Sequence, residues 1–438
     1  MRLPIVHRTF CTARSVFRIA AFISALGIGS LSARAQTLSS DEQKLSAYAD
    51  AHQEELLKLL QQTVEINSST ENLAGVKQVG AIFQKEFDLL HFKTKWIEMP
   101  AEMKRAGHLF AEHEGTHGKR LLLIGHLDTV LPGGKFRREG TKIYGSGVND
   151  MKGGDLVLLY ALKALDSIGA LDGTRLTIAF TGDEEAPGEP LEVDRHDLIE
   201  AAHHSDLAFA FENAIGDTAT VARRGSSTWR LEVSGMTGHS SGIFSAVAGD
   251  GSIYEASRIL NEFREQLKQF DGLTYNPAVI VGGTDVALDG NKGTASGKTN
   301  VIAQTTYVKG DLRASSAEQL EQARAKMREI ISHNLRRTSA KIAFEDGYPS
   351  MSATPENYAL IKQLDQASRD LGYGAVAATD PKVRGAGDIS FVAPIIPGLD
   401  GLGARGTGAH APTEMADAAS FPELVKRTAI LIYRLTRE

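Results

Sequence analysis

Three short and mostly apolar runs stand out in the first half of the chain: 121–124 (LLLI), 175–180 (RLTIAF) and 207–211 (LAFAF). Runs of this length without alternation are typical of strands buried on both faces of a parallel sheet. Imidazole or carboxylate side chains follow each run closely, namely His126 and Asp128, Asp183 to Glu185, and Glu212. Open α/β sheets bind their ligands beyond the carboxyl ends of the strands. The pattern therefore predicts one functional site at that edge of the sheet.

Apolar residues at helical spacing predict helices between and after these strands. The expected helices cover 41–64, 76–90, 156–165, 358–371 and 423–435, and further strands are expected at 92–99 and 109–113. Strands and helices that alternate in this way predict an α/β domain whose mostly parallel sheet is flanked by helices. Asp150 lies in a glycine-rich turn just before one of these helices, so it is expected at the same edge of the sheet.

The pattern changes from about Val221, where the segment RRGSSTWRLEVSGMTGHSS alternates like a half-buried antiparallel strand. The elements expected after it are a helix at 252–270, strands at 277–287 and 299–313, a helix at 316–335 and a strand at 341–345. This order predicts an α+β unit with a four-stranded antiparallel sheet and two helices. We therefore predict that residues 222–346, called the inserted domain below, interrupt the α/β domain, which is made of 36–221 and 347–438.

The composition allows two ordinary hydrophobic cores and gives no sign of nucleic-acid binding. Of the 438 residues 42% are hydrophobic, and the formal net charge is -6. Basic residues at the N-terminus precede an apolar stretch at 19–31 and the sequence Ala33-Arg34-Ala35. This layout predicts a signal peptide at 1–35 with cleavage after Ala35, and no membrane association afterwards. An uncleaved anchor is the alternative, but the apolar stretch is shorter than the roughly 20 residues that a membrane-spanning helix needs.

Cysteine usage limits the chemistry of the site. Cys11 is the only cysteine and lies in the predicted signal peptide. The mature protein would then contain neither disulfides nor cysteine ligands, and a metal site would consist of imidazole and carboxylate groups. Such a donor set suits zinc but also manganese or cobalt. An exported protein of this kind is expected in a bacterial periplasm or outside the cell.

Two of the local patterns have an unremarkable interpretation when each is taken alone. His126 and Asp128 lie on the same side of an extended chain, so the carboxylate can orient the imidazole of a metal ligand. A pair of this kind is more often a satisfied hydrogen bond or a surface turn. Likewise, Asp183 to Glu185 would be a solvated acidic turn if no histidine motifs accompanied it. The combination of motifs decides the interpretation.

Five segments occur together and in order: GHLDTV, GSGVNDMKGG, TGDEE, FEN and GTGAHAPTE. The set resembles the M20 family of dinuclear zinc metallopeptidases, and in particular its glutamate carboxypeptidase (carboxypeptidase G2-like) branch. The resemblance covers nearly all of the chain after the predicted signal peptide. It implies a catalytic domain interrupted by a lid or dimerisation domain, and therefore a homodimer formed through the inserted domain.

The resemblance also assigns roles to single residues. Asp150 would bridge two zinc ions, His126 and Glu212 would complete one site, and Glu185 and His410 would complete the other. Glu184 would act as general base and Asp128 would assist catalysis by orienting His126. A water activated between the two metals would then attack an amide bond of a small peptide or N-acyl amino acid.

The resemblance places substrate contacts in the inserted domain, at His239, Asn300 and Arg313. Together with the signal sequence it favours a carboxypeptidase that releases a C-terminal amino acid, with glutamate as one candidate. Deacylation of N-acyl amino acids, cleavage of dipeptides and removal of succinyl groups remain open alternatives. A protein that binds amino acids or peptides without catalysis is an alternative of another class.

Two features depart from what the resemblance leads us to expect. The segment after Glu185, APGEPLEVDRHDLIEAAHHSD, is longer and richer in proline. Its histidines, His203 and His204, are expected at a helix end rather than at a metal. Arg384 precedes a glycine-rich turn around Asp388, and its position suggests the hypothesis of a second positive group near an acidic substrate.

Overall fold

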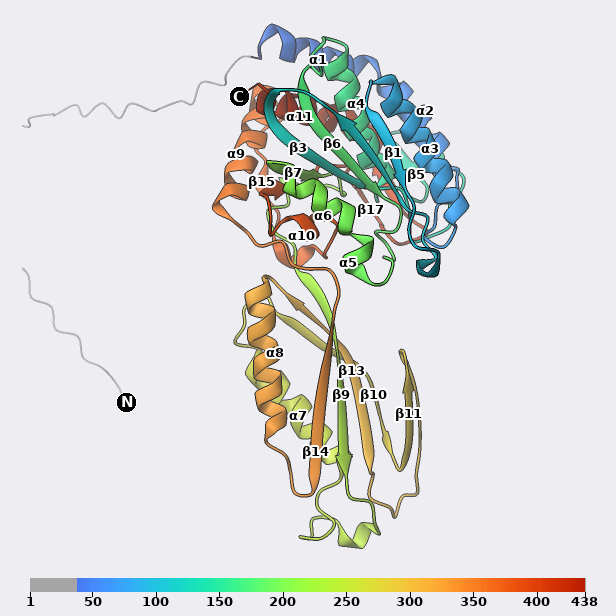
Figure 1. Ribbon diagram of the computed structural model, residues 1–438, viewed down its shortest axis with the longest axis vertical. Helices are drawn as coiled ribbons and strands as arrows, with labels where there is room; N and C mark the ends of the chain where they lie inside the picture. The colour runs from blue at the N-terminus through green and yellow to red at the C-terminus, as the bar shows by residue number, and fades with distance from the viewer. Residues whose placement is uncertain (1–37, 438) are drawn as a thin grey trace, which may run out of the picture. The chain divides into compact units, whose positions relative to one another are not determined.

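The structure, a computed structural model, describes residues 38–437, so the predicted signal peptide lies outside the described residues. Its largest sheet has six strands in the order β1-β2-β6-β3-β7-β16. The strands are β1 (Lys93–Ile97), β2 (His108–His113), β3 (His117–His126), β6 (Thr174–Thr181), β7 (Leu207–Ala210) and β16 (Gly398–Leu399). Strands β6, β3, β7 and β16 are parallel, whereas β1 and β2 pair antiparallel at one edge. The prediction of a mostly parallel sheet is confirmed (Figure 1).

Strand β3 shows why its apolar residues are consecutive. Leu121 and Leu123 pack into one hydrophobic cluster, while Leu122 and Ile124 pack into another on the opposite side. Successive side chains of a strand point to opposite faces, so a strand between two cores has to be apolar at every position. Because this strand is buried and ends at His126, it fixes the position of that residue at the edge of the sheet.

Helices cover both faces of this sheet. Those that contribute to the larger cluster are α1 (Ser40–Ala51), α2 (Gln53–Val64), α3 (Leu73–Leu89), α4 (Lys152–Asp166), α9 (Pro355–Asp370) and α11 (Phe421–Leu435). The other face carries α6 (His196–His203) and α10 (Ile389–Val392), and the short α5 (Leu191–Asp194) precedes α6. The single helix expected at 41–64 is in fact two, because His52 leaves helical geometry with φ -109° and ψ 12°. In the described part of the chain, no helix combines the length and apolarity needed to cross a bilayer.

Short strands and turns complete this part of the chain. A four-stranded sheet joins β4 (Arg137–Glu139), β5 (Lys142–Tyr144), β17 (Gly406–Thr407) and β18 (Met415–Asp417), and a parallel pair joins β8 (Thr218–Ala219) to β15 (Ala377–Ala378). Pairing of β18 with β5 places the loop that carries His410 against the turn that carries Asp150. Residues 265 positions apart in sequence thereby become neighbours. The 3-10 turns of this part are η1 (Ala101–Met103), η3 (Pro381–Val383) and η4 (Ala418–Ser420), while η2 (Ser240–Gly242) lies in the inserted domain.

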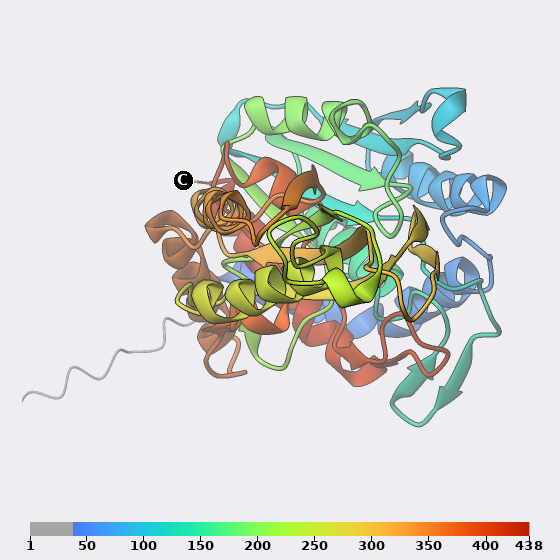
Figure 2. The same ribbon diagram turned by 90° about the horizontal axis from the view of Figure 1, so that it is seen from below.

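A second, antiparallel sheet has the order β10-β13-β9-β14 (Figures 1 and 2). Its side chains belong to a separate hydrophobic core. Its elements are β9 (Gly225–Gly235), α7 (Ser252–Leu267), β10 (Thr274–Gly283), β13 (Thr305–Ala314), α8 (Ala317–Ser332) and β14 (Thr338–Asp346). The predicted end of the strand at 277–287 was wrong. Strand β10 stops at Gly283, and a separate hairpin of β11 (Asp285–Asp289) and β12 (Lys292–Ser296) follows. Gly290, with φ 55°, turns that hairpin in a backbone conformation that favours glycine.

Candidate metal centre

His126 is positioned by its own strand and by the next turn. Its imidazole is 1% exposed, and Nδ1 lies 3.1 Å from the carbonyl oxygen of Asp128 and 3.3 Å from its carboxylate Oδ1. We expected the carboxylate alone to orient the ring, whereas the backbone oxygen is the closer acceptor. A proton on Nδ1 leaves the lone pair of Nε2 free. Among the described residues, this buried Nε2 has no hydrogen-bond partner.

Asp150 lies between the two histidines. Its Oδ1 is 3.4 Å from His126 Nε2, and its Oδ2 is 3.2 Å from His410 Nε2. Each oxygen therefore faces a different imidazole. This is the arrangement that a carboxylate bridging two cations requires.

Glu212 and Glu185 complete two groups that share Asp150. Glu212 Oε1 lies 3.8 Å from His126 Nε2, and Glu185 Oε2 lies 3.0 Å from His410 Nε2. Nitrogen and oxygen ligands at about 2.0–2.2 Å from a tetrahedral ion are themselves about 3.4 Å apart, close to these separations. The residue groups are therefore consistent with two metal ions, and the orphaned Nε2 of His126 supports the fit.

Glu184 is also close to the centre, with its Oε2 3.9 Å from His126 Nε2. A group of His126, Glu184 and Glu185 has ligand spacing too, so geometry alone permits either glutamate as a ligand. Burial raises the pKa of Glu184 well above its usual value, and the nearby charge of Glu212 raises it further. A carboxyl group whose pKa is raised in this way holds a proton more readily, which suits a proton carrier.

The pKa values of the clustered carboxyl and imidazole groups indicate a site that favours bound cations. Burial, reinforced by the charge of Asp150, raises the pKa of Glu212 to about 8. Hydrogen bonds to Asp150 and Glu185 raise the pKa of His410 to about 11. Burial acts to raise the pKa of Asp150, but the two imidazoles that face its oxygens outweigh it and hold that pKa well below its usual range. The acidic groups thus draw protons onto the imidazoles, and divalent cations would replace those protons.

His410 reaches the centre from the loop between β17 and β18. Its backbone is left-handed, with φ 64°, a conformation that few residues other than glycine adopt. Residues held in this way cluster at functional sites, where the surrounding structure determines the geometry. The side chain is 56% exposed, so this loop forms the open side of the centre.

Glu414 supports the centre and was missed in the sequence analysis. Its buried carboxylate accepts the backbone N–H groups of Gly147, Asn149 and Asp150 at 2.9, 2.9 and 3.0 Å. These bonds fix the turn that carries Asp150. The residue belongs to the segment GTGAHAPTE, but only the fold shows what it contacts.

A glycine and an arginine determine the surroundings of Glu212. A Cβ on Gly154, in the first turn of α4, would lie 1.8 Å from the carbonyl oxygen of Phe211, so glycine lets the helix approach the end of β7. Arg223 lies 3.9 Å from Glu212 and forms a buried ion pair with Asp400. It provides a fixed positive charge beside the predicted ligand.

The structure does not bring the three predicted substrate-binding residues together within one chain. His239 and Asn300 are exposed neighbours, linked by a hydrogen bond from Ser240 N to the carbonyl oxygen of Asn300. Arg313 lies near the opposite end of β13 and pairs with Ser226 in the register of the sheet. At about 3.4 Å per residue, the length of the strand separates the two groups by more than 20 Å.

Arg384 is not offered to solvent as a second substrate group. Its side chain is buried, and Nη1 donates to Asn213 Oδ1 at 2.9 Å. Burial and the charge of Arg223 lower its pKa. Its side-chain hydrogen bond is thus with Asn213, the residue that follows the predicted ligand Glu212.

Comparison with known proteins places this geometry in a family. Residues 122–434 match the peptidase family M20/M25/M40, and the chain belongs to that family. It is a metal-dependent peptidase, and therefore a hydrolase.

Two relatives indicate the range of activities in the family. The chain is 25% identical to carboxypeptidase G2 of Pseudomonas sp. (strain RS-16) over 401 residues, which cover 88% of this chain and 91% of that protein. It is 34% identical to succinyl-diaminopimelate desuccinylase of Novosphingobium aromaticivorans over 144 residues, which cover 30% of this chain and 37% of that enzyme.

Solved structures share the fold. A tripeptidase from Staphylococcus aureus superposes with a TM-score of 0.67 at 19% identity and covers 88% of this chain and 99% of that one. A dinuclear metal-binding peptidase of the M20 family from Bacillus subtilis gives a TM-score of 0.61 at 14% identity, with coverages of 88% and 99%.

Proposed function

We propose that this metallopeptidase is a carboxypeptidase that releases a C-terminal amino acid, with glutamate as the first candidate. The main observation that supports a hydrolytic metal site is the position of Asp150, whose two oxygens face two imidazoles. The similarity to carboxypeptidase G2 over 88% of the chain favours this activity over desuccinylation, since the desuccinylases of Novosphingobium aromaticivorans and Rickettsia bellii match 30% and 55% of it.

The residues of the chain divide the work of hydrolysis. Two divalent cations, when bound, would polarise the scissile carbonyl and lower the pKa of a water molecule. Glu184 would accept the proton from the attacking water and deliver it to the leaving amine. Its raised pKa in a buried site fits both halves of that transfer. Arg313 would bind the free carboxylate of the substrate, because its planar fork matches two carboxylate oxygens.

The substrate class can be tested directly. The protein, loaded with zinc or cobalt, is offered N-acyl-glutamate, other N-acyl amino acids, an N-succinyl amino acid and unblocked dipeptides, each with and without chelator. We expect N-acyl-glutamate or a peptide with C-terminal glutamate to be hydrolysed with the highest kcat/KM, and chelator to abolish hydrolysis. Preference for unblocked dipeptides or for succinyl substrates would replace the carboxypeptidase assignment by one of those activities. Bound metal with no turnover of any compound would favour a binding protein.

Export and dimerisation are part of the same proposal. The basic and apolar N-terminus with Ala33-Arg34-Ala35 supports a protein exported to the periplasm or beyond and cleaved after Ala35. Mass spectrometry of the exported protein would give the new N-terminus, and an intact N-terminus would contradict cleavage. A homodimer through the inserted domain would let His239 and Asn300 of one copy approach the substrate held by Arg313 of another. Light scattering on the purified protein tests this, because a monomer leaves those two residues without a substrate to contact.

A further inference from the structure

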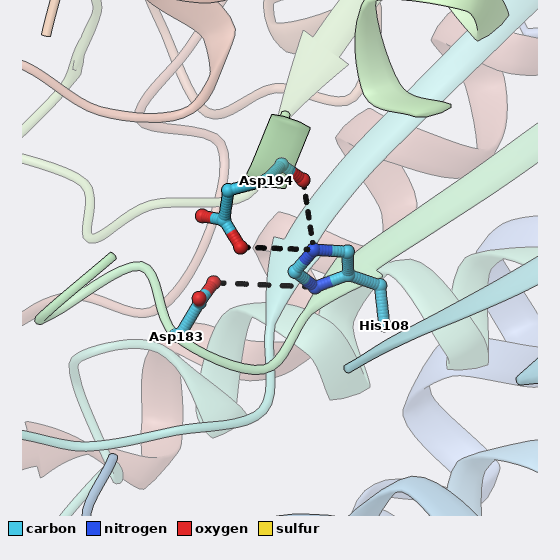
Figure 3. A group of neighbouring side chains, drawn as sticks. All are labelled: His108, Asp183 and Asp194. Atoms are coloured by element: carbon cyan, nitrogen blue, oxygen red, sulfur yellow. Dashed lines mark hydrogen bonds and ion pairs between the residues drawn. The ribbon is translucent and has the colours of Figure 1, made fainter. Parts of the chain in front are cut away.

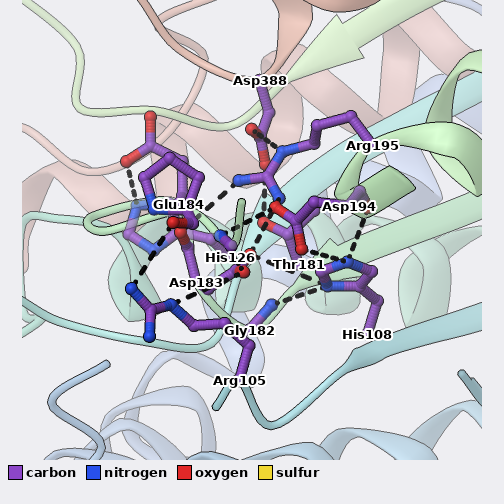
Figure 4. A network of polar contacts seen from close by, with 12 residues as sticks. Arg105, His108, His126, Thr181, Gly182, Asp183, Glu184, Asp194, Arg195 and Asp388 are labelled. Carbon is purple, nitrogen blue, oxygen red and sulfur yellow. Dashed lines mark hydrogen bonds and ion pairs between the residues drawn. The ribbon is translucent and has the colours of Figure 1, made fainter. Parts of the chain in front are cut away.

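The loop that carries Glu184 is fixed from outside along its whole length. Residues 181–188 (TGDEEAPG) contribute backbone or side-chain groups that are bound by residues of other elements. The donors and acceptors that hold them belong to Arg105, His108, Asp128, Asp194, Arg195, Tyr348 and Asp388. Figure 4 labels five of these partners, namely Arg105, His108, Asp194, Arg195 and Asp388. Few of these partners come from the five motifs that define the metal centre. Apart from Asp128, the loop therefore depends on residues with no role yet assigned.

Arg195 is the central cation of this surrounding network. It is 0% exposed and lies in the proline-rich segment after Glu185. Its Nη1 donates to Asp183 Oδ1 at 2.8 Å and also to Asp194, while Nε donates to Asp388 Oδ1 at 2.8 Å. One guanidinium thus joins three buried carboxylates, and a planar group with five donors is suited to that arrangement. Removing it would leave charges without a counterion in the interior.

Tyr348 connects Arg195 to the predicted base. Its hydroxyl donates to the carbonyl oxygen of Glu184 at 2.8 Å and accepts from Arg195 Nη2 at 2.9 Å. Tyr348 follows β14 in the segment that leads out of the inserted domain, and its carbonyl accepts the N–H of Ser226 at 2.8 Å. The ring packs against Phe391 with centroids 4.8 Å apart. The hydroxyl therefore reaches the Glu184 peptide from a rigid base.

We propose that Tyr348 and Arg195 are positioning residues that hold the Glu184 backbone in the geometry needed for proton transfer. The inference rests on the proposed role of Glu184 as general base. Asp128 holds the N–H of Glu184 at 3.0 Å, and Tyr348 holds the carbonyl oxygen of the same residue. Two fixed ends leave the side chain little freedom to leave the centre. The proline-rich segment thereby gains a function, since it delivers the arginine on which Tyr348 depends.

A third metal ion at His108, Asp183 and Asp194 is the competing explanation, since these residues have ligand spacing (Figure 3). Both ring nitrogens of His108 are already occupied. Nδ1 accepts the N–H of Gly182 at 3.2 Å, and Nε2 lies 3.1 Å from the carbonyl oxygen of Asp194. Arg195 already supplies a cation to both carboxylates. The observations favour the arginine as the resident positive charge.

The test removes only the hydroxyl, in Tyr348→Phe, and compares it with Tyr433→Phe. Tyr433 serves as a matched control because its hydroxyl contacts Asp41, between α11 and α1. We expect Tyr348→Phe to lower kcat about 10- to 100-fold, because small misplacements of a catalytic group cost this much. KM and the content of two metals per chain should stay unchanged. Hydrogen exchange measured by mass spectrometry should become faster in the peptide covering 181–188. Tyr433→Phe should change neither kcat nor the exchange of that peptide.

Different outcomes separate the competing explanations. Unchanged kcat and unchanged exchange in Tyr348→Phe, beside an inactive Glu184→Gln, would overturn the positioning role alone. Full activity in Glu184→Gln would overturn the base assignment on which it rests. A rise in KM without a fall in kcat would make Tyr348 a substrate contact instead. A third tightly held metal that His108→Ala releases would assign the buried cluster to a cation.

Arg195→Lys extends the test to the arginine itself, since lysine keeps the charge but not the planar fork. We expect faster exchange at 181–188 and a larger fall in kcat than in Tyr348→Phe. Wild-type kcat and exchange in a folded Arg195→Lys protein would contradict the role of the fork. If that variant does not fold, Tyr348→Phe still decides the proposal, because the phenylalanine ring keeps its packing against Phe391.

Discussion

The carboxylate of Asp128 accepts the backbone N–H of Glu184 at 3.0 Å, and its second oxygen accepts the N–H of Glu185 at 3.1 Å. The same residue accepts a hydrogen bond from His126 Nδ1 through its carbonyl oxygen. One aspartate therefore orients a predicted ligand and the predicted base together. Thr70 completes the arrangement by donating its hydroxyl to Asp128 Oδ2 at 2.6 Å.

Asp128→Asn should therefore impair both metal affinity and turnover. An amide of the same shape keeps one acceptor but presents an N–H₂ group to the other backbone N–H, and it removes a negative charge near the imidazole. Loss of such supporting groups commonly costs about 10- to 100-fold in metal affinity or activity. Metal titration with a competing chelator and steady-state kinetics would measure the two effects. Thr70→Val is the matched control, since it removes one bond to Asp128 but leaves the carboxylate, and its effect should be the smaller one.

Glu184→Gln separates the base from the ligands. If Glu184 carries the proton, the variant should keep both metals and lose about 10²- to 10⁴-fold in kcat, the usual contribution of a general base. Elemental analysis together with kcat on the best substrate checks this. Glu185→Gln should behave in the opposite way and lose metal from the group it shares with His410. Metal loss in Glu184→Gln instead would mean that the two adjacent glutamates have exchanged roles.

His410→Ala should deplete metal from the same group. His410 supplies the only imidazole in the group formed by Asp150, Glu185 and His410, so its loss leaves only two carboxylates as ligands there. We expect metal content to fall toward one ion per chain after dialysis, with activity falling in parallel. His204→Ala is the control, because that exposed histidine lies at the end of α6. Two ions retained per chain would remove His410 from the ligand set.

The sequence allowed prediction of the elements whose pattern is local. Strand β3 has an unbroken apolar run because both its faces are buried, and the motif around Glu184 follows a strand with the same signature, whereas Asp150 lies in a glycine-rich turn just before a helix. These features lie within a few residues of one another. The five predicted ligands were named from the resemblance of these motifs to the M20 family, and the structure brings their side chains within reach of each other.

The supporting residues could not be found in this way, because their meaning lies in contacts between distant segments. Glu414 binds the turn of Asp150 from 264 positions away, and Tyr348 binds Glu184 from 164 positions away. A lone glutamate or tyrosine in a loop has no periodicity that marks its partner. The β11–β12 hairpin was missed for another reason. Strand-forming residues stand on both sides of Gly282 and Gly283, so the composition does not show where one strand ends and the next begins.

The buried acids around Arg195 should make folding stability depend on pH in an unusual direction. Burial, together with the charge of Asp183, raises the pKa of Asp194 from 3.8 to about 8, while Arg195 opposes that rise. Between those values the folded chain holds a proton on Asp194 that the unfolded chain releases. The stabilising contribution of this group is therefore complete below pH 3.8 and is lost as the pH rises through 8.

Asp194→Asn removes this dependence while keeping the shape of the side chain. The wild-type free energy of unfolding should fall relative to that of the variant as the pH rises from 5 to 8, by at most about 1.4 kcal/mol per pH unit. Urea unfolding of both proteins across this range, after chelator treatment, measures the difference. Subtracting one curve from the other cancels the titration of His126 and the other groups common to both proteins. Parallel curves would show that Asp194 is ionised in the folded chain, with the charge of Arg195 outweighing the effect of burial.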